Sequence, residues 1–344
     1  MTAIQLPVGI IADNPNFPEP WDLIVAKAKI ADSLGYHSIW LGETWGYELF
    51  TSLADLARET KQIRLAAGIA NVYSRSPGVI AATAATLDER SGGRMILGLG
   101  SSGPQVIEHW HGVPFEKPLA RIHEYVDIIN MIMRREPLVY NGSLFHLERG
   151  FKLRFRPIRD HIPIYLASLT PKSIKQAGAV ADGILPTYWP IHKLDVMRQE
   201  LDAGSESAQR PAGSAEIAPY LTTAILLNEE YRDYARQLAR APIAWYIGRM
   251  GAFYADMLRR TGFPAEVDAV LEGWKSGPDA AAAGVSDAML DATAIVGTPE
   301  EMANRLMEWR RAGVALPIIS MPPGSAEDAE KALGALRDAL AEKL

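Results

Sequence analysis

The sequence has no cysteine, no long hydrophobic run and no excess of basic residues. Without cysteine there can be no disulfide, no thiol nucleophile and no thiolate metal site. No apolar run approaches the ~18 residues that a membrane-spanning helix needs, and the first residues lack the pattern of a secretory signal. The net charge of -6 argues against nucleic acid or an anionic membrane as a partner, because both require basic patches. We therefore expect a cytoplasmic protein with neither of these partners.

Apolar runs with β-strand character alternate with helical patterns along almost the whole chain of 344 residues. Strands that alternate with helices indicate parallel pairing, and runs that are apolar throughout indicate strands covered on both faces. Eight such units favour a closed (β/α)8 TIM barrel of the α/β class over an open sheet. The predicted strands are Val8–Ala12, Ser38–Glu43, Ile63–Asn71, Arg94–Gly100, Ile162–Leu169, Gly183–Pro186, Ile217–Leu227 and Leu316–Met321.

One segment, Asn228–Ala294, does not fit this alternation and is predicted to be a largely helical insertion before the last strand. Its apolar residues recur at helical spacing, which indicates a packed core or a dimer face rather than a substrate pocket. No linker or low-complexity tract divides residues 1–344, so we expect one domain. The other predicted helices are Trp21–Leu34, Leu49–Glu59, Gly78–Arg90, Leu119–Arg134, Pro171–Val180 and Ala326–Leu340.

The stretch MILGLGSSG places Gly98, Gly100 and Gly103 in the G-x-G-x-x-G spacing of a dinucleotide-binding loop. That fingerprint also needs an acid at the end of the next strand to hold the ribose, and the nearest candidate, Glu116, lies between two prolines. A nicotinamide-dependent enzyme is therefore disfavoured. A strand that ends in glycines and serines before a helix can still present N–H groups and hydroxyls to a phosphate, or form only a tight turn.

Further motifs accompany the glycine loop, namely YSRSP, ATLDERSGGR, TPKSIKQAGAVADG and VGTPEEM. In this combination the chain resembles the bacterial luciferase-like family. It is similar to the branch that depends on the deazaflavin coenzyme F420, which includes methylene-tetrahydromethanopterin reductase. The resemblance implies a TIM barrel, a homodimer and a coenzyme at the C-terminal mouth of the barrel. It further implies an oxidoreductase that moves a hydride between F420 and a small organic substrate.

Two alternatives keep the same fold. With FMN in the site, the protein would be a flavin-dependent, luciferase-like monooxygenase fed by a separate reductase. A barrel that binds its coenzyme without turnover would be a catalytically silent carrier. The resemblance covers most of the chain and is weakest in the predicted insertion, where substrate specificity would lie. For this insertion the resemblance also implies a lid over the barrel mouth.

The resemblance also implies the residues that contact the coenzyme. The Asp-His pair common in the family is Glu43–Thr44 here, and the glutamate that some sugar-phosphate members carry after the glycine loop is replaced by Gly103 and Pro104. The proton-transfer step of those members therefore does not carry over. A non-prolyl cis peptide, which related proteins carry, is placed between Gly68 and Ile69. The ring-side residues are Glu43, Thr44, Gly68, Ile69 and Asn71, the phosphate-side residues are Ser101, Ser102, Ala167, Ser168 and Leu169, and Gly183 and Ile184 follow at the sixth strand.

Three residues are candidates for catalysis at the mouth, Glu43, Thr44 and Asp13. Glu43 ends the second predicted strand, where a barrel exposes catalytic groups, although it could instead cap the next helix or pair with a nearby arginine. Asp13 closes the first strand as a substrate-side acid or as a turn residue. His109 and His111 have no third ligand nearby, so no metal site is expected, and a packed or surface histidine is favoured over an acid–base role.

Overall fold

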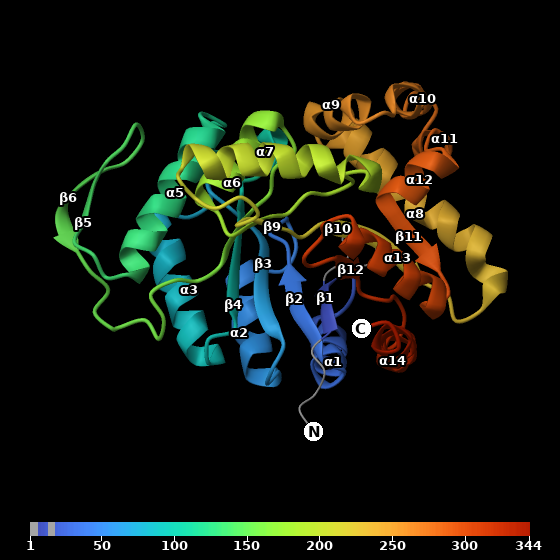
Figure 1. Ribbon diagram of the computed structural model, residues 1–344, viewed down its shortest axis with the longest axis horizontal. Helices are drawn as coiled ribbons and strands as arrows, with labels where there is room; N and C mark the ends of the chain where they lie inside the picture. The colour runs from blue at the N-terminus through green and yellow to red at the C-terminus, as the bar shows by residue number, and fades with distance from the viewer. Residues whose placement is uncertain (1–5, 13–17) are drawn as a thin grey trace.

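The computed structural model describes residues 6–12 and 18–344. Ten strands form one curled sheet in which every pair is parallel, in the order β11-β10-β12-β1-β2-β3-β4-β7-β8-β9. Figure 1 shows this sheet at the centre of the molecule with helices around it. The strands are β1 (Leu6–Ile11), β2 (Tyr36–Leu41), β3 (Arg64–Asn71), β4 (Met95–Gly100), β7 (Ile164–Leu166), β8 (Gly183–Ile184), β9 (Glu216–Ile217), β10 (Tyr220–Ile225), β11 (Ala294–Gly297) and β12 (Ile318–Ser320).

Several helices begin at a hydroxyl residue followed by proline, a pair that satisfies a free N–H group and presets the backbone for the first turn. Ser76, Thr170 and Thr298 are such N-caps, and each is followed by proline. The helices are α1 (Trp21–Ser33), α2 (Leu49–Glu59), α3 (Pro77–Ser91), α4 (Pro104–His109), α5 (Pro118–Met133), α6 (Pro171–Val180), α7 (Leu194–Ser207), α8 (Arg232–Arg249), α9 (Ala252–Arg260), α10 (Pro264–Gly273), α11 (Pro278–Ala283), α12 (Asp287–Thr293), α13 (Pro299–Arg311) and α14 (Ala326–Ala341), with short 3-10 turns η1 (Ile191–Lys193) and η2 (Glu229–Tyr231).

Each predicted strand overlaps a strand of the sheet, and the prediction Ile217–Leu227 corresponds to β9 and β10 together. The predicted segment 228–294 is helical as expected, forming α8 to α12, which Figure 1 shows gathered at the right-hand side of the sheet. It does not lead directly into the last strand, however, because β11 and α13 come before β12. No turn residue marks the start of β11, since Ala294 is at once the C-cap of α12 and the first residue of β11.

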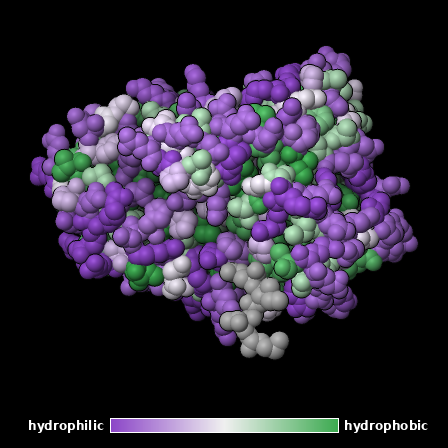
Figure 2. All heavy atoms as spheres, viewed as in Figure 1, coloured by the Kyte–Doolittle hydropathy of each residue, from purple (hydrophilic) through white to green (hydrophobic). Residues whose placement is uncertain are grey.

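A two-stranded hairpin, β5 (Leu138–Asn141) and β6 (His146–Phe151), stands apart from the main sheet and projects at the far left of Figure 1. The surface shown in Figure 2 is mainly hydrophilic, and its hydrophobic residues form small separate patches. Among the residues described, no helix is long and apolar enough to cross a membrane.

Apolar side chains form two separate clusters on the two faces of the curled sheet. The large cluster includes Ile39 and Leu41 and joins the strands to the surrounding helices. The small cluster includes Trp40, the residue between them, so it lies on the opposite face because successive strand residues alternate. The Trp40 ring meets the rings of Tyr165 and Tyr220 edge-on, at centroid distances of 5.8 and 6.0 Å. This second core fills the inside of the curl.

Candidate active site

The carboxylate of Glu43 lies just beyond β2 and is held by residues that follow β3. Its Oε2 accepts hydrogen bonds from the backbone N and the side-chain Nδ2 of Asn71, both at 2.8 Å. Its Oε1 forms an ion pair with Arg75, whose other nitrogen pairs with Glu48. Only 8% of the Glu43 side chain is exposed. The sequence left two non-catalytic roles open for Glu43, pairing with an arginine or capping the next helix. The structure contains the pair with Arg75, whereas the N-cap of α2 is Glu48.

Asn71 connects Glu43 to His111. The Asn71 side chain is almost fully buried, and its Oδ1 accepts from the backbone N–H groups of Tyr73 and Ser74 at 3.0 and 2.8 Å. Its Nδ2 therefore faces Glu43 and also lies 3.3 Å from His111 Nε2. Because an amide nitrogen only donates, His111 Nε2 accepts and a neutral ring carries its proton on Nδ1. The sequence did not suggest this contact, because 40 positions separate the two residues.

The peptide bond between Gly68 and Ile69 is cis, which confirms the prediction from the sequence. The pairing register between β3 and β4 shifts at the same place, between Ala67 and Ala70. Tyr220 on β10 donates a hydrogen bond of 3.0 Å to the Gly68 carbonyl. A Cβ atom on Gly68 would lie 1.5 Å from that hydroxyl oxygen, so only glycine fits while Tyr220 keeps its place.

The loops that follow β4 and β7 lie side by side, since Ala167 N donates to Leu99 O at 2.9 Å. In the described part of the chain, the hydroxyls of Ser102 and Ser168 have no hydrogen-bond partner. The backbone N–H groups of Ser101, Ser102 and Gly103 likewise donate to no acceptor in residues 6–12 and 18–344. Neighbouring hydroxyl and amide donors with free hydrogens are the groups that bind phosphate. The donor set therefore fits the phosphate of a coenzyme.

The remaining predicted residues occupy different places. Thr44 is exposed in the loop before α2, and Leu169 is half-buried ahead of α6. Gly183 and Ile184 are buried in β8 and pair with Tyr165 and Leu166 of β7. Asp13 lies outside the described residues.

Three tyrosines join the helical segment to the sheet. Tyr188 lies in the loop after β8, Tyr246 on α8 and Tyr254 on α9, and neighbouring ring centroids are 4.7 to 6.3 Å apart. Burial raises the pKa of all three, so their hydroxyls stay protonated. Arg260, the last residue of α9, reaches the loop after β7, where its Nη2 donates to Leu169 O at 2.6 Å. Sequence reasoning gave no role to Arg260.

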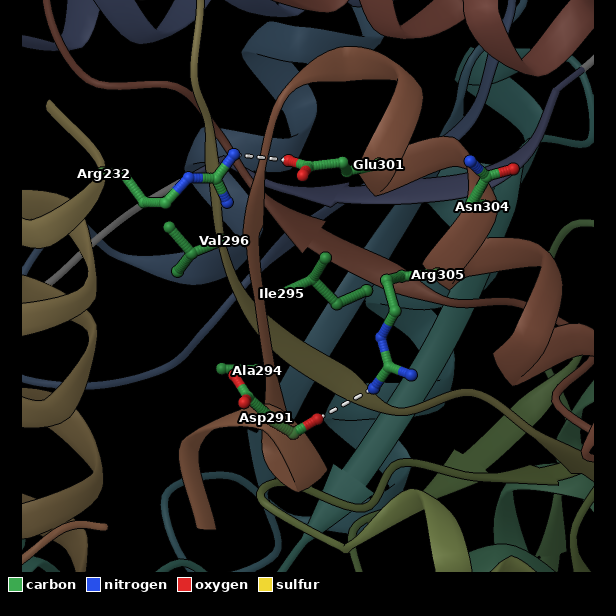
Figure 3. A pocket seen from close by; sticks show the side chains of 8 residues that line it. All are labelled: Arg232, Asp291, Ala294, Ile295, Val296, Glu301, Asn304 and Arg305. Atoms are coloured by element: carbon green, nitrogen blue, oxygen red, sulfur yellow. Dashed lines mark hydrogen bonds and ion pairs between the residues drawn. The ribbon is translucent and has the colours of Figure 1, made fainter. Parts of the chain in front are cut away.

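A pocket of about 450 Å³ lies elsewhere, between β11 and α13 (Figure 3). Its arginines are already engaged, because Arg232 pairs with Glu229 and Glu301, and Arg305 donates to the Asp291 carbonyl. None of the predicted coenzyme residues lines it, so we do not place the active site there. Within the described residues, no cluster of His, Asp and Glu could hold a metal ion. The lining residues are Arg232, Asp291, Ala294, Ile295, Val296, Glu301, Asn304 and Arg305.

The curled parallel sheet defines an α/β protein, and the free donors on the loops at its strand ends form a candidate anion-binding site. The sequence profile of the luciferase-like monooxygenase family matches residues 4–316, so the chain belongs to this family. It is 34% identical, over 86% of its length and 89% of the relative's, to a Mycobacterium tuberculosis protein named as a coenzyme F420-dependent oxidoreductase. It is 30% identical, over 86% of its length and 88% of the relative's, to the 5,10-methylenetetrahydromethanopterin reductase of Archaeoglobus fulgidus.

Solved structures share the fold. The coenzyme F420-dependent tetrahydromethanopterin reductase of Methanopyrus kandleri superposes with a TM-score of 0.83 at 23% identity, covering 98% of this chain and 99% of that one. A type II Baeyer–Villiger monooxygenase of Pseudomonas putida in complex with FMN superposes with a TM-score of 0.71 at 17% identity, covering 98% of each chain. Proteins named for either coenzyme thus have this fold.

Proposed function

We propose that the protein is an oxidoreductase that transfers a hydride between coenzyme F420 and a small organic substrate at the carboxyl ends of the strands. The observation that carries the proposal is the set of free donors on the loops after β4 and β7. It is supported by two relatives that are at least 30% identical over 86% of the chain, one named for coenzyme F420 and the other a methylenetetrahydromethanopterin reductase. FMN is the alternative coenzyme, since structures with the same fold include an FMN complex. A barrel that binds its coenzyme without turnover is the third possibility.

We also propose that the sheet is a closed (β/α)8 barrel carrying the helical insertion. The segment that contains β9 and β10 bonds to β8 on one side, through Ala218 N and Ile184 O at 2.9 Å. It bonds to β12 on the other side, through Ile318 N and Pro219 O at 3.0 Å. The inner cluster around Trp40 also contains residues from both sides of this segment, namely Leu185, which follows β8, and Ile318 of β12. Barrel closure places all the strand ends at one mouth.

The coenzyme would lie with its ring near the end of β3 and its phosphate at the loops after β4 and β7. When bound, it supplies the hydride chemistry. Ser102 and Ser168 would donate to the phosphate, whereas Gly68, Ile69 and Asn71 would border the ring. Ala167, Leu169 and the β8 residues Gly183 and Ile184 would shape the wall between these two parts.

The residues of this chain would position the substrate and move a proton. The buried pair of Glu43 and Arg75 fixes Asn71, and Asn71 in turn orients the ring of His111. We propose that His111 Nδ1–H exchanges a proton with a substrate oxygen or nitrogen. It would take the place of the glutamate that some family members carry after the glycine loop and that this chain lacks. Glu43 and Thr44 stay candidates for direct contact with the ring and substrate, and Asp13 for the substrate side.

The tautomer of His111 gives an independent test. Nitrogen-15 NMR of histidine-labelled protein should find the proton of neutral His111 on Nδ1. In Asn71→Leu the ring should no longer favour this tautomer. His109, which is exposed on α4, serves as the control ring in the same spectrum. A neutral His111 protonated mainly on Nε2 would contradict the role.

Titration with F420 and with FMN tests the coenzyme directly. We expect F420 to bind, with a change in its fluorescence, and FMN to bind much more weakly. The reverse order would favour the monooxygenase. Tight F420 binding without turnover on a panel of alcohols, carbonyls and imines would favour the carrier.

We further propose a homodimer in which the outer face of α8 contacts a second copy. Tyr234, Leu238 and Trp245 recur at helical spacing and are 65%, 38% and 43% exposed, an arrangement typical of an interface. Sedimentation at micromolar concentration should give a dimer, and Trp245→Arg should give a monomer. A wild-type monomer would exclude this arrangement.

A further inference from the structure

We propose that Arg260 binds the anionic side chain of the coenzyme and closes the phosphate side of the site, an inference that rests on the F420 function proposed above. Arg260 belongs to the helical segment, far in sequence from the serines that would hold the phosphate. The geometry nevertheless brings its guanidinium to the same corner of the mouth.

The position of Arg260 is defined by two contacts. Its Nη2 donates to the Leu169 carbonyl at 2.6 Å, one residue after Ser168. Its guanidinium carbon lies 5.9 Å from the ring centre of Trp189, in the loop after β8. No carboxylate within the described ranges forms an ion pair with Arg260, and the residue is exposed. The charge is thus held in place and left without a counter-ion from that part of the chain.

The surroundings of Leu169 favour an anion. Ser168 is 6% exposed, and its hydroxyl has no partner among the described residues. The stretch from His161 to Ala181 contains no aspartate or glutamate. Lys172 lies in the first turn of α6, where a cation is unfavourable next to the helix dipole unless an anion lies nearby. The Arg260 guanidinium thus lies one residue from the unpartnered hydroxyl of Ser168, and Lys172 adds a second cation three residues after Leu169 along the chain.

Arginine suits this task better than lysine. A guanidinium has five N–H donors in a rigid plane, so one N–H can donate to the Leu169 carbonyl while others donate to a phosphate oxygen. A lysine ammonium would keep the charge without this fixed direction. Arg260→Lys should therefore retain part of the effect, and Arg260→Gln should lose the electrostatic part.

The experiment compares two ligands that share the deazaflavin ring. F420 carries the phosphate and its lactyl-glutamyl extension, and Fo has the ring and ribityl chain without any of these anionic groups. Dissociation constants are measured by fluorescence titration of the wild type, Arg260→Gln, Arg260→Lys and Arg259→Gln. Arg259 is the matched control, because it already pairs with Asp268 at 2.8 Å.

For Arg260→Gln we expect F420 to bind about tenfold more weakly and Fo to bind within about twofold of the wild type. The loss should shrink at high salt, and Arg259→Gln should bind both ligands normally. Equal losses for F420 and Fo would overturn the inference, because Arg260 would then act only by holding the helical segment in place. F420 affinity unchanged in Arg260→Gln would also overturn it. If the wild type bound neither ligand, the proposed function itself would fail.

Discussion

Replacing Gly68 by alanine tests how tightly the end of β3 is packed. The new Cβ atom would lie 1.5 Å from Tyr220 Oη, 2.9 Å from Tyr220 Cζ and 3.0 Å from Trp40 Cε3. The tyrosine ring must move, and its hydrogen bond to the Gly68 carbonyl is lost. Losing the bond costs about 1 kcal/mol and overpacking costs about 1–3 kcal/mol, so the free energy of unfolding should fall by about 2–4 kcal/mol.

Urea denaturation followed by tryptophan fluorescence measures this change. Gly103→Ala is the matched control, because a Cβ atom there meets nothing within 4 Å and should change stability by no more than about 0.5 kcal/mol. Tyr220→Leu removes the obstructing hydroxyl, so in that background Gly68→Ala should cost clearly less than in the wild type. Equal effects of Gly68→Ala and Gly103→Ala, or an undiminished cost of Gly68→Ala in the Tyr220→Leu background, would refute this explanation.

Contacts outside β3 give three other predictions. Arg75→Ala strips a buried carboxylate of its partner and should destabilise by about 3 kcal/mol in urea unfolding, and adding Glu43→Gln should recover part of the loss. A hydrogen bond that His161 donates to the Asp182 carboxylate raises the pKa of His161. Burial alone would raise the pKa of Asp182, but the hydrogen bonds that it accepts from His161 and Ile164 N lower it. The free energy of unfolding of the wild type should therefore exceed that of His161→Gln in mild acid. This difference should disappear as pH rises through the raised pKa of His161 and shrink again as pH falls through the lowered pKa of Asp182. A difference independent of pH would contradict this. Gly334→Ala, inside α14 with open space around its Cβ, should stabilise by up to about 1 kcal/mol, and a lower thermal midpoint would count against it.

Nine strands of the sheet, the helices α1, α2, α3, α5, α6 and α14 and the helical segment 228–294 could be predicted, because their apolar runs and turn residues are local signals. The helices α4, α7 and α13 were not predicted. The cis bond at Gly68 was predicted from the family resemblance. The contact of Asn71 with His111 and that of Arg260 with Leu169 depend on how distant loops meet after folding, which no local pattern encodes. β11 escaped prediction because four apolar residues directly after a helix do not distinguish a strand from a continued helix.

The tyrosines at positions 188, 246 and 254 have a consequence for how relatives of this protein diverge. The helical segment contacts the loop after β8 at these points through edge-on aromatic rings, which tolerate small shifts better than directional hydrogen bonds do. Substitutions on α8 and α9 can therefore reshape the space above the strand ends while the inner cluster around Trp40 keeps its packing. One continuous stretch of the gene can thus change the space above the strand ends while the sheet is inherited unchanged.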